Sequence, residues 1–433
     1  MQVIENSKVK EKVYIEKLEN GMTFMCIPKK HTEKKYVIWG THYGSNDNKF
    51  IVPGEEKVTE VPNGVAHFLE HKMFEQENKP NSLDVLTALG VEANAYTTND
   101  HTAYLFEATN NFYEALDELM DYFQHPYFTD QNVEKEKGII DQEIRMYEDY
   151  PEWKVYLNAI GDMYQKHPIR IDITGTSETI SHINKEILYG CYKTFYHPAN
   201  TIMVVCGDFV PEEILKEVKK RLLPKELQPE IKRIETDEPN EIKQKMSIQK
   251  MEASIPLFTI AYKDVKPSTD IVKKHIAIEI LLGILIGKSS KLYQTLYEKD
   301  LLKNEPDLDY EFSKDYAHVL IMGTSNNPQE MEKLFLNEVE QLKKDGINND
   351  DFTRNKRKVY GDFIRGYNDV SEIARTFLAD SFKGINSFDY LEEYEAVSKE
   401  YAEQVLMEVF NENKEVLSIV EKWSQMSNFK INC

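Results

Sequence analysis

Two histidines and a glutamate within five consecutive residues carry the clearest chemical signal in this sequence. His67-Phe68-Leu69-Glu70-His71 reads H-x-x-E-H, the inverted motif of zinc peptidases. On a helix, the two histidines lie one turn apart on the same face, so both imidazoles can reach one Zn²⁺ at about 2.0–2.1 Å. Glu70 directly precedes the second histidine and can reach a water bound to that metal. A third ligand from another element would leave the fourth position open for water or substrate.

A long acidic helix predicted over 130–148 offers the third ligand. Glu136 and Glu143 are seven residues apart, two helical turns, so they share a face. A carboxylate among apolar residues needs a metal or another partner to offset its burial. Spacing alone does not choose between these two and the other acids of the segment, and it does not exclude a solvated acidic face. Those other acids include Glu134, Asp141 and Glu148.

The elements that must position these residues follow from apolar alternation and helical periodicity. In the first half we expect a polar loop over 44–62, and then a helix that is capped by Asn63 and carries the H-x-x-E-H residues. The expected strands are 13–18, 22–27, 36–43, 91–98, 102–109 and 201–207, and the further helices are 82–89, 111–124, 130–148, 152–166, 185–196 and 211–222.

The pattern restarts after a charged, proline-containing stretch that is typical of a linker. The strands expected there are 245–251, 257–263, 308–312, 318–323 and 416–420, and the helices are 270–286, 290–300, 328–344, 350–366, 371–382 and 399–411. Two halves with the same element order predict a duplicated α+β domain. The predicted division is a zinc-binding catalytic domain over 1–222, a linker over 223–245, and a homologous domain without the metal motif over 246–433.

Composition restricts the class of partner and the compartment. The formal net charge of −21 opposes nucleic-acid binding and docking on an anionic membrane, and it favours basic peptides. No run of 18 apolar residues predicts a membrane helix, and no signal peptide is visible at the N-terminus. The four cysteines form no C-x-x-C pair, which is typical of a reducing compartment, so we predict a cytoplasmic protein. They are Cys26, Cys191, Cys206 and Cys433.

Three segments in the same order resemble the pitrilysin/insulinase family of zinc peptidases, in the YmfH-like bacterial branch related to mitochondrial processing peptidase. GVAHFLEHKMF at 64–74 is similar to the active-site helix of that family, and ANAYT at 93–97 is similar to the strand after it. EKGIIDQE at 136–143 is similar to the E-x6-E segment that supplies the third zinc ligand. The likeness covers nearly the whole first half and implies a duplicated fold, in which each of two homologous domains packs a mostly antiparallel sheet against several helices.

The resemblance assigns roles to individual residues. It implies that His67, His71 and Glu143 bind one Zn²⁺ per chain and that Glu70 is the general base acting on the zinc-bound water. It implies that Glu136 orients or tunes the site from behind a ligand. Asn94, Ala95 and Tyr96 would lie on an edge strand that pairs with an extended peptide substrate.

The second half departs from the family pattern. Family members that act alone carry an arginine and a tyrosine in a segment like L-R-E-K-G-L-A-Y, where these residues hold the substrate and stabilise the oxyanion. Here Tyr297 stands at the arginine position and Lys303 at the tyrosine position, and no arginine occurs over 287–314. We expect a heterodimer in which a homologous subunit supplies both residues. The alternatives are a homodimer, or local substitution by Lys303, Tyr297 or Tyr310.

The leading hypothesis for function is a zinc endopeptidase that acts on short or unfolded peptides, together with a paired homologous subunit. The alternative is a zinc-containing binding or assembly subunit with little chemistry. A purely structural zinc site is the weakest interpretation, because such sites usually have four protein ligands. Glu70 argues against both alternatives, since a site without hydrolysis needs no base.

Overall fold

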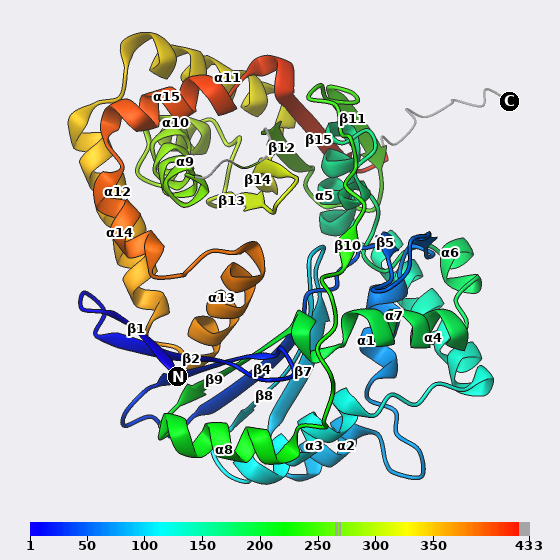
Figure 1. The fold of residues 1–433 in the computed structure, drawn as a ribbon. Helices are drawn as coiled ribbons and strands as arrows, with labels where there is room; N and C mark the ends of the chain where they lie inside the picture. The colour runs from blue at the N-terminus through cyan, green and yellow to red at the C-terminus, as the bar shows by residue number, and fades with distance from the viewer. Residues whose placement is uncertain (265–266, 268–269, 424–433) are drawn as a thin grey trace, which may run out of the picture. The chain divides into compact units, whose positions relative to one another are not determined.

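The chain forms two compact units, and neither is one continuous segment (Figure 1). The computed structural model describes residues 1–264, 267 and 270–423. The first unit consists of 1–144, 171–236 and 360–392, and the second consists of 145–170, 237–359 and the segment from 393 onward. The change of unit near 236 falls within the predicted linker, but the chain also changes unit near 144, 170, 359 and 392.

The first unit is built on a seven-stranded sheet. Only β3 and β9 pair in parallel, and all other neighbours are antiparallel. The strand order is β1 (Gln2–Asn6), β2 (Glu11–Lys17), β3 (Thr23–Pro28), β9 (Thr201–Gly207), β4 (Lys35–Thr41), β8 (Thr102–Ala108) and β7 (Glu92–Thr97). The strand β7 is therefore an edge strand, as expected for the segment that contains Asn94.

Alternating side chains of this sheet feed two separate apolar layers. On β4, Val37 and Trp39 join one layer, while Tyr36 and Ile38 join the other. The first layer is covered by helices that include α1 (Val65–Lys72), α3 (Phe112–Gln124), α7 (Lys185–Phe195) and α8 (Pro211–Arg221). The second is covered by α13 (Val370–Lys383), which lies on the opposite face of the sheet (Figure 1).

Several short elements of this unit escaped sequence-based prediction. The expected loop over 44–62 is wrong in part, because β5 (Lys49–Ile51) and β6 (Val58–Glu60) pair there and β5 also pairs with β10 (Lys232–Arg233). Strands of two or three residues are too short to produce an alternation signal. The strand β1 and the five-residue helix α6 (Ser177–Ser181) were also not expected. In contrast, the helices α2 (Ser82–Ala88) and α4 (Asp130–Glu148) lie where the sequence predicted them.

The second unit repeats the sheet of the first. Its order is β11 (Met246–Lys250), β15 (Glu415–Glu421), β12 (Leu257–Lys263), β14 (Ala317–Thr324) and β13 (Asp307–Phe312). Only β11 and β15 are parallel. This is the order and pairing of β3, β9, β4, β8 and β7, so the predicted duplicated α+β fold is confirmed.

The helices of the second half complete this repeat, and α5 (Pro151–Met163) adds to it from the first half. Ala159 and Ile160 of α5 pack on one face of the second sheet against Ala261, Leu320 and Val416. Each sheet thus takes a covering helix from the other half of the sequence: α5 for the second sheet and α13 for the first. The remaining helices are α9 (Ile271–Leu285), α10 (Lys291–Glu298), α11 (Pro328–Asp345), α12 (Asn349–Gly366), α14 (Asp389–Ala396) and α15 (Lys399–Val409).

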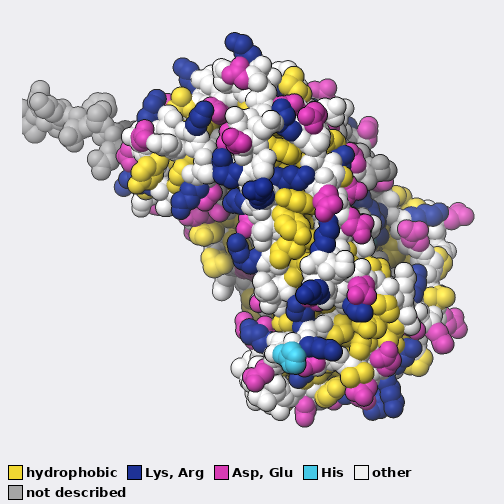
Figure 2. Space-filling model, turned by 90° about the vertical axis from the view of Figure 1, so that its left-hand side faces the viewer, with side chains coloured by type: hydrophobic (Ala, Val, Ile, Leu, Met, Phe, Trp, Pro, Cys, Tyr) yellow, Lys and Arg dark blue, Asp and Glu magenta, His cyan; other side chains and the backbone are white. Residues whose placement is uncertain are grey.

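The surface mixes charges of both signs. On the face drawn in Figure 2, acidic and basic side chains are interspersed with hydrophobic ones, so the net negative charge is not gathered there in one acidic field. No helix within the described ranges is both long enough and apolar enough to cross a membrane.

Candidate metal centre

The helix α1 begins at a glycine that the local packing requires. Gly64 is its N-cap residue with φ +94°, and a Cβ at this position would lie 2.5 Å from the carbonyl oxygen of Thr174. The predicted cap by Asn63 is wrong, because Gly64 takes that place and receives no side-chain cap. The Asn63 amide oxygen instead accepts a hydrogen bond from Asn48 Nδ2 at 2.7 Å. The close approach of two backbones therefore fixes where the motif helix starts.

The helix α1 is buried almost all round, and three of its buried side chains are ionisable. His67 is 8% exposed, Glu70 is 9% exposed and Lys72 is fully buried. Burying ionisable groups costs free energy unless partners compensate for lost hydration. The partners therefore determine what this helix can do.

The two histidines of α1 converge with Glu143 of α4, which lies beside α1 (Figure 1). His67 Nε2 is 3.6 Å from Glu143 Oε1, and His71 Nε2 is 3.6 Å from Glu143 Oε2. One ligand atom from each of the three residues falls within 4.8 Å of the others, and no other such group of three occurs among the described residues. Two imidazole nitrogens and a carboxylate oxygen are the donor set of catalytic zinc sites.

The protonation of His67 suits a metal ligand. Burial and the neighbouring His71 lower the pKa of His67 to about 3, so its imidazole is neutral at pH 7 and keeps a lone pair. Its Nε2 faces Glu143, while its Nδ1 is buried without a hydrogen-bond partner among the described residues. His67 is therefore positioned by packing.

His71 is instead positioned by a charged chain behind it. Its Nδ1 lies 3.1 Å from Glu136 Oε1, and Glu136 Oε2 lies 3.5 Å from Lys72 Nζ, which also pairs with Glu75 at 2.6 Å. Burial raises the pKa of Glu136, but hydrogen bonds from His71 and the charge of Lys72 outweigh burial and lower it overall. Likewise, burial lowers the pKa of His71, but Glu136, Glu70 and Glu143 raise it overall. Because these contacts engage Nδ1 of His71, its Nε2 is directed toward Glu143.

Glu70 is held by a residue that sequence reasoning did not single out. Glu70 Oε2 accepts a hydrogen bond of 2.5 Å from the hydroxyl of Thr97 on β7. Burial raises the pKa of Glu70, with Thr97 opposing the shift. Strand alternation could have indicated Thr97, because Ala93, Ala95 and Thr97 share the face of β7 that points toward α1.

The expected substrate strand divides its side chains between the two faces of the sheet. Asn94 is exposed, and its Oδ1 accepts a hydrogen bond from the backbone N–H of Ala95 at 2.8 Å. The side chain of Tyr96 packs on the α13 face, with His101 at 5.6 Å and Arg375 at 5.4 Å from its ring. Only the backbone of Tyr96 is therefore available at the edge near Glu70.

The candidate replacements for the family arginine and tyrosine lie in the second unit. Tyr297 is 61% exposed on α10, and Lys303 pairs loosely with Asp300 at 3.7 Å. Tyr310 is buried and donates to Asp264 Oδ2 at 2.7 Å. The hydroxyl of Tyr310 is therefore engaged inside the second unit, whereas Tyr297 and Lys303 are accessible.

Comparison with known proteins places the chain among peptidases. The profile described as insulinase (peptidase family M16) matches residues 54–177, and the profile described as peptidase M16 inactive domain matches 182–359. YmfH of Bacillus subtilis, named as an uncharacterized zinc protease, is 37% identical over 94% of this chain and 95% of its own.

Two further relatives differ in how much of the chain they cover. The crystal structure of a chain described as an M16-like peptidase from Alicyclobacillus acidocaldarius aligns with a TM-score of 0.91 at 30% identity, over 96% of this chain and 99% of the other. A protein named as a mitochondrial-processing peptidase subunit beta of Arabidopsis thaliana is 27% identical over 40% of this chain and 33% of its own length.

Proposed function

Because this chain belongs to the insulinase family of peptidases, family M16, we propose that it is a zinc-dependent endopeptidase acting on short or unfolded peptides. One observation carries the proposal: His67, His71 and Glu143 converge within 4.8 Å, with Glu70 on the same helix as the two histidines. A structural metal site would need no buried carboxylate at the position of Glu70.

The roles of these residues follow from their contacts. His67, His71 and Glu143 would hold the zinc, which when bound acidifies a water molecule and polarises the scissile carbonyl. Glu70 accepts the proton of the attacking water and passes it to the leaving amine. Burial makes Glu70 a stronger base than an exposed carboxylate, and the Thr97 hydroxyl fixes the position of one of its oxygens.

Glu136 acts through His71. By accepting a hydrogen bond from Nδ1 it fixes the tautomer that presents Nε2, and Lys72 holds Glu136 in place. The edge strand β7 is our proposed substrate platform, where an extended peptide pairs with the backbone of Asn94, Ala95 and Tyr96. A peptide that uses the Ala95 amide would displace the Asn94 side chain from it.

We propose that the active form is paired. The segment 287–314 contains no arginine, and a missing oxyanion donor costs roughly 10²–10³ in rate. A homologous subunit that carries the arginine and tyrosine would restore it, and the beta-subunit name of the Arabidopsis relative is consistent with paired chains. A homodimer instead predicts that activity per chain rises with concentration of this chain alone. If activity per chain rises neither with the concentration of this chain nor on addition of a homologous subunit, the proposal of a paired active form is wrong.

The test of the main proposal compares three forms on a mixture of unstructured, internally quenched peptides. Glu70→Gln should lower cleavage by about 10²–10⁴-fold while one zinc per chain stays bound. Glu134→Gln, on the exposed side of α4, is the matched control and should cleave like the wild type. Equal cleavage by the wild type and Glu70→Gln would refute the assignment of the base.

A second candidate is a zinc-containing binding or assembly subunit without catalysis. It is favoured by the missing arginine and by the match of 182–359 to a domain described as inactive. Zinc binding without cleavage, at any concentration and with any homologous subunit, would select it. The cytoplasmic location stays a prediction, consistent with Cys26, Cys191 and Cys206 being buried free thiols.

A further inference from the structure

A hollow lies entirely within the second unit, between α5 and the edge of its sheet. It encloses about 550 Å³, enough for a long side chain. The helix α5 packs on the sheet through Ala159, Ile160 and Met163, while its first turns stand over β13 and β14. The N-terminal end of α5 therefore forms one wall and β13 forms the opposite wall.

The helix wall is aromatic. Trp153 and Tyr156 both line the hollow, and their ring centroids are 5.4 Å apart. The ring of Tyr147, at the end of α4, lies 5.6 Å from the Trp153 ring, centroid to centroid. Among aromatic side chains, tryptophan attracts a cation most strongly, and tyrosine attracts one less strongly.

The strand wall is acidic. Asp307, Asp309 and Glu311 alternate along β13, so their side chains share the face that lines the hollow. Glu311 accepts hydrogen bonds from Tyr316 at 3.1 Å and from Tyr156 at 3.4 Å, which ties the two walls together. Neither Asp307 nor Asp309 forms an ion pair with a lysine or arginine of the described part of the chain.

The charges of this hollow are of one sign. Its lining contains four carboxylates, from Glu152, Asp307, Asp309 and Glu311, and no basic residue. Reduced hydration and the neighbouring Glu311 raise the pKa of Asp309, and His275 and His318 oppose the shift. Glu311 Oε2 lies 3.3 Å from His318 Nε2, so the carboxylates of β13 without an ion-pair partner in the described part of the chain are those of Asp307 and Asp309. A bound cation would relieve the repulsion between these carboxylates.

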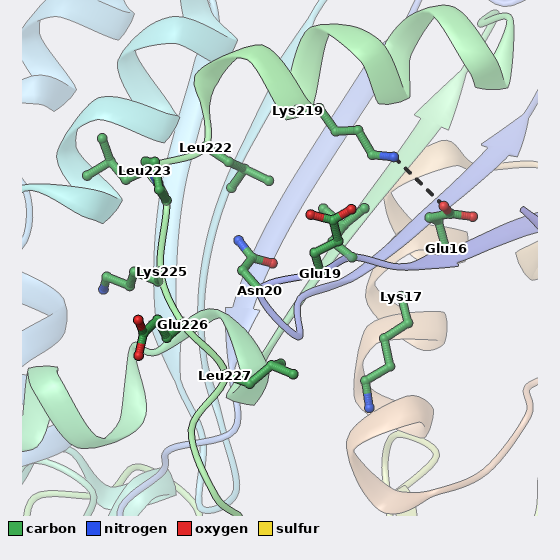
Figure 3. A pocket seen from close by; sticks show the side chains of 12 residues that line it. Glu16, Lys17, Glu19, Asn20, Lys219, Leu222, Leu223, Lys225, Glu226 and Leu227 are labelled. Carbon is green, nitrogen blue, oxygen red and sulfur yellow. Dashed lines mark ion pairs between the residues drawn. The ribbon is translucent and has the colours of Figure 1, made fainter.

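A hollow of the first unit provides the contrast (Figure 3). It lies between the end of α8 and the turn after β2, and its lining has three lysines and three glutamates, with Lys219 and Glu16 at 3.8 Å. Its positive and negative side chains are equal in number, so it favours neither a cationic nor an anionic ligand. The hollow beside β13 has no such balance.

We propose that the hollow between α5 and β13 binds the cationic side chain of an arginine- or lysine-bearing peptide. The guanidinium or ammonium group would lie against the Trp153 and Tyr156 rings while Asp307 and Asp309 bind its N–H groups. The occupant is a peptide side chain because a lining of aromatic rings and aliphatic side chains beside carboxylates suits an alkyl stem with a charged end. This binding does not depend on hydrolysis, so it can be tested separately from the proposed peptidase activity.

The test uses the full chain carrying Glu70→Gln, so that peptides are bound without being cut. The probes are a fluorescent, end-blocked Ala-Ala-Arg-Ala-Ala peptide and the same peptide with citrulline, its neutral analogue, followed by anisotropy. We expect the arginine peptide to bind at least tenfold more tightly. Equal affinity for the two peptides would overturn the proposal without the need for any further variant.

Charge-matched variants separate this site from the general acidity of the chain. Asp307→Asn with Asp309→Asn should weaken arginine-peptide binding about tenfold or more and leave citrulline-peptide binding unchanged. Glu298→Gln with Asp350→Asn removes the same charge elsewhere in the second unit and should have little effect. Trp153→Leu should also weaken binding. Equal losses in both double variants would show only non-specific attraction, which overturns the proposed site, as would tight Ca²⁺ binding without an arginine preference.

Discussion

The helices α1 and α9 occupy the same place in the two repeats, yet the eight-residue α1 buries three ionisable side chains whereas the fifteen-residue α9 buries one. Each is the first helix after the equivalent strands β4 and β12 and precedes the edge strand of its sheet. The helix α1 buries His67, Glu70 and Lys72. The buried positions of α9 are aliphatic except for Lys274, which pairs with Asp264 at 2.8 Å. One repeat thus preserves the fold with an apolar helix, so the ionisable groups of α1 are not needed for the architecture.

This comparison separates what builds the fold from what does chemistry. Ionisable groups buried at a helix that the fold would accept as aliphatic are retained at a cost in stability. The first repeat offsets this cost with a network that also aligns donor atoms for a metal. Function is therefore a local addition to one of two similar scaffolds.

The largest expected effect is on metal binding by the first unit. Glu143→Ala removes one of the three proposed ligands and should weaken zinc binding by about 10²–10³-fold. Competition with a chromophoric chelator measures this. Glu134→Ala, exposed on the same helix, should bind zinc like the wild type. Unchanged affinity in Glu143→Ala would mean that another acid of α4 is the ligand.

Lys72 tests how the charges of α1 are tolerated. Lys72→Met leaves Glu136 and Glu75 without their buried cation and should lower the free energy of unfolding by about 3–5 kcal/mol. Urea unfolding with a chelator present, followed by circular dichroism, excludes any contribution from zinc. The double variant with Glu136→Gln should recover part of the loss. If Lys72→Met is as stable as the wild type, the pair does not hold the helix.

The matching change in α9 should affect stability alone. Leu281 is fully buried, and Leu281→Ala should lower the free energy of unfolding by about 2–5 kcal/mol through the cavity it leaves. Zinc affinity, measured by the same chelator competition, should not change. A coupled loss of zinc binding would contradict the separation of scaffold and site.

The smallest effect concerns a carboxylate that the second unit buries beside another one. Burial is the main cause that raises the pKa of Glu415 to about 9, and the charge of the neighbouring Glu332 is the second. Lys245, 3.9 Å away, opposes the shift only weakly. The folded state therefore holds a proton that the unfolded chain releases above pH 4.5, so stability should fall as pH rises from about 4.5 to 9.

Glu415→Gln removes this dependence. It should stabilise the protein by about 1–3 kcal/mol more at pH 8 than at pH 5, measured by urea unfolding at both values. Glu298→Gln, which replaces an exposed carboxylate of α10 in the same unit, is the control and should change this difference little. An identical pH dependence in wild type and Glu415→Gln would show that Glu415 is not the buried titrating group.

Sequence reasoning succeeded where the signal was local and periodic. The spacing of His67 and His71 predicted a shared helix face, and the helix bounds of α3, α4 and α8 agree with the pattern to within a residue. The choice of Glu143 needed the family resemblance, because spacing on an acidic helix does not distinguish an inward carboxylate from a solvated one.

What the sequence did not reveal depends on contacts between distant segments. A lysine in the last turn of a helix, such as Lys72, is ordinary in a sequence and is normally exposed. Only the structure shows that Lys72 is buried beside Glu136. Asn63 is a favourable cap residue by type, but the backbone near Thr174 forces Gly64 into that position. The predicted contiguous domains missed the transfer of α5 and α13, since an amphipathic helix does not specify which sheet it will cover.

The exchange of covering helices has a consequence for synthesis. The face of the first sheet that carries Ile38, Leu105 and Val204 is covered by α13, which ends at residue 383, whereas the last strand of that sheet ends at 207. At about 5–20 residues per second, a ribosome delivers α13 some 9–35 s after that strand. During this interval an apolar surface stays open on the nascent chain. The first unit can therefore complete its folding only late in translation, after α13 has been synthesised. Until then its exposed apolar surface is of the kind that chaperones bind.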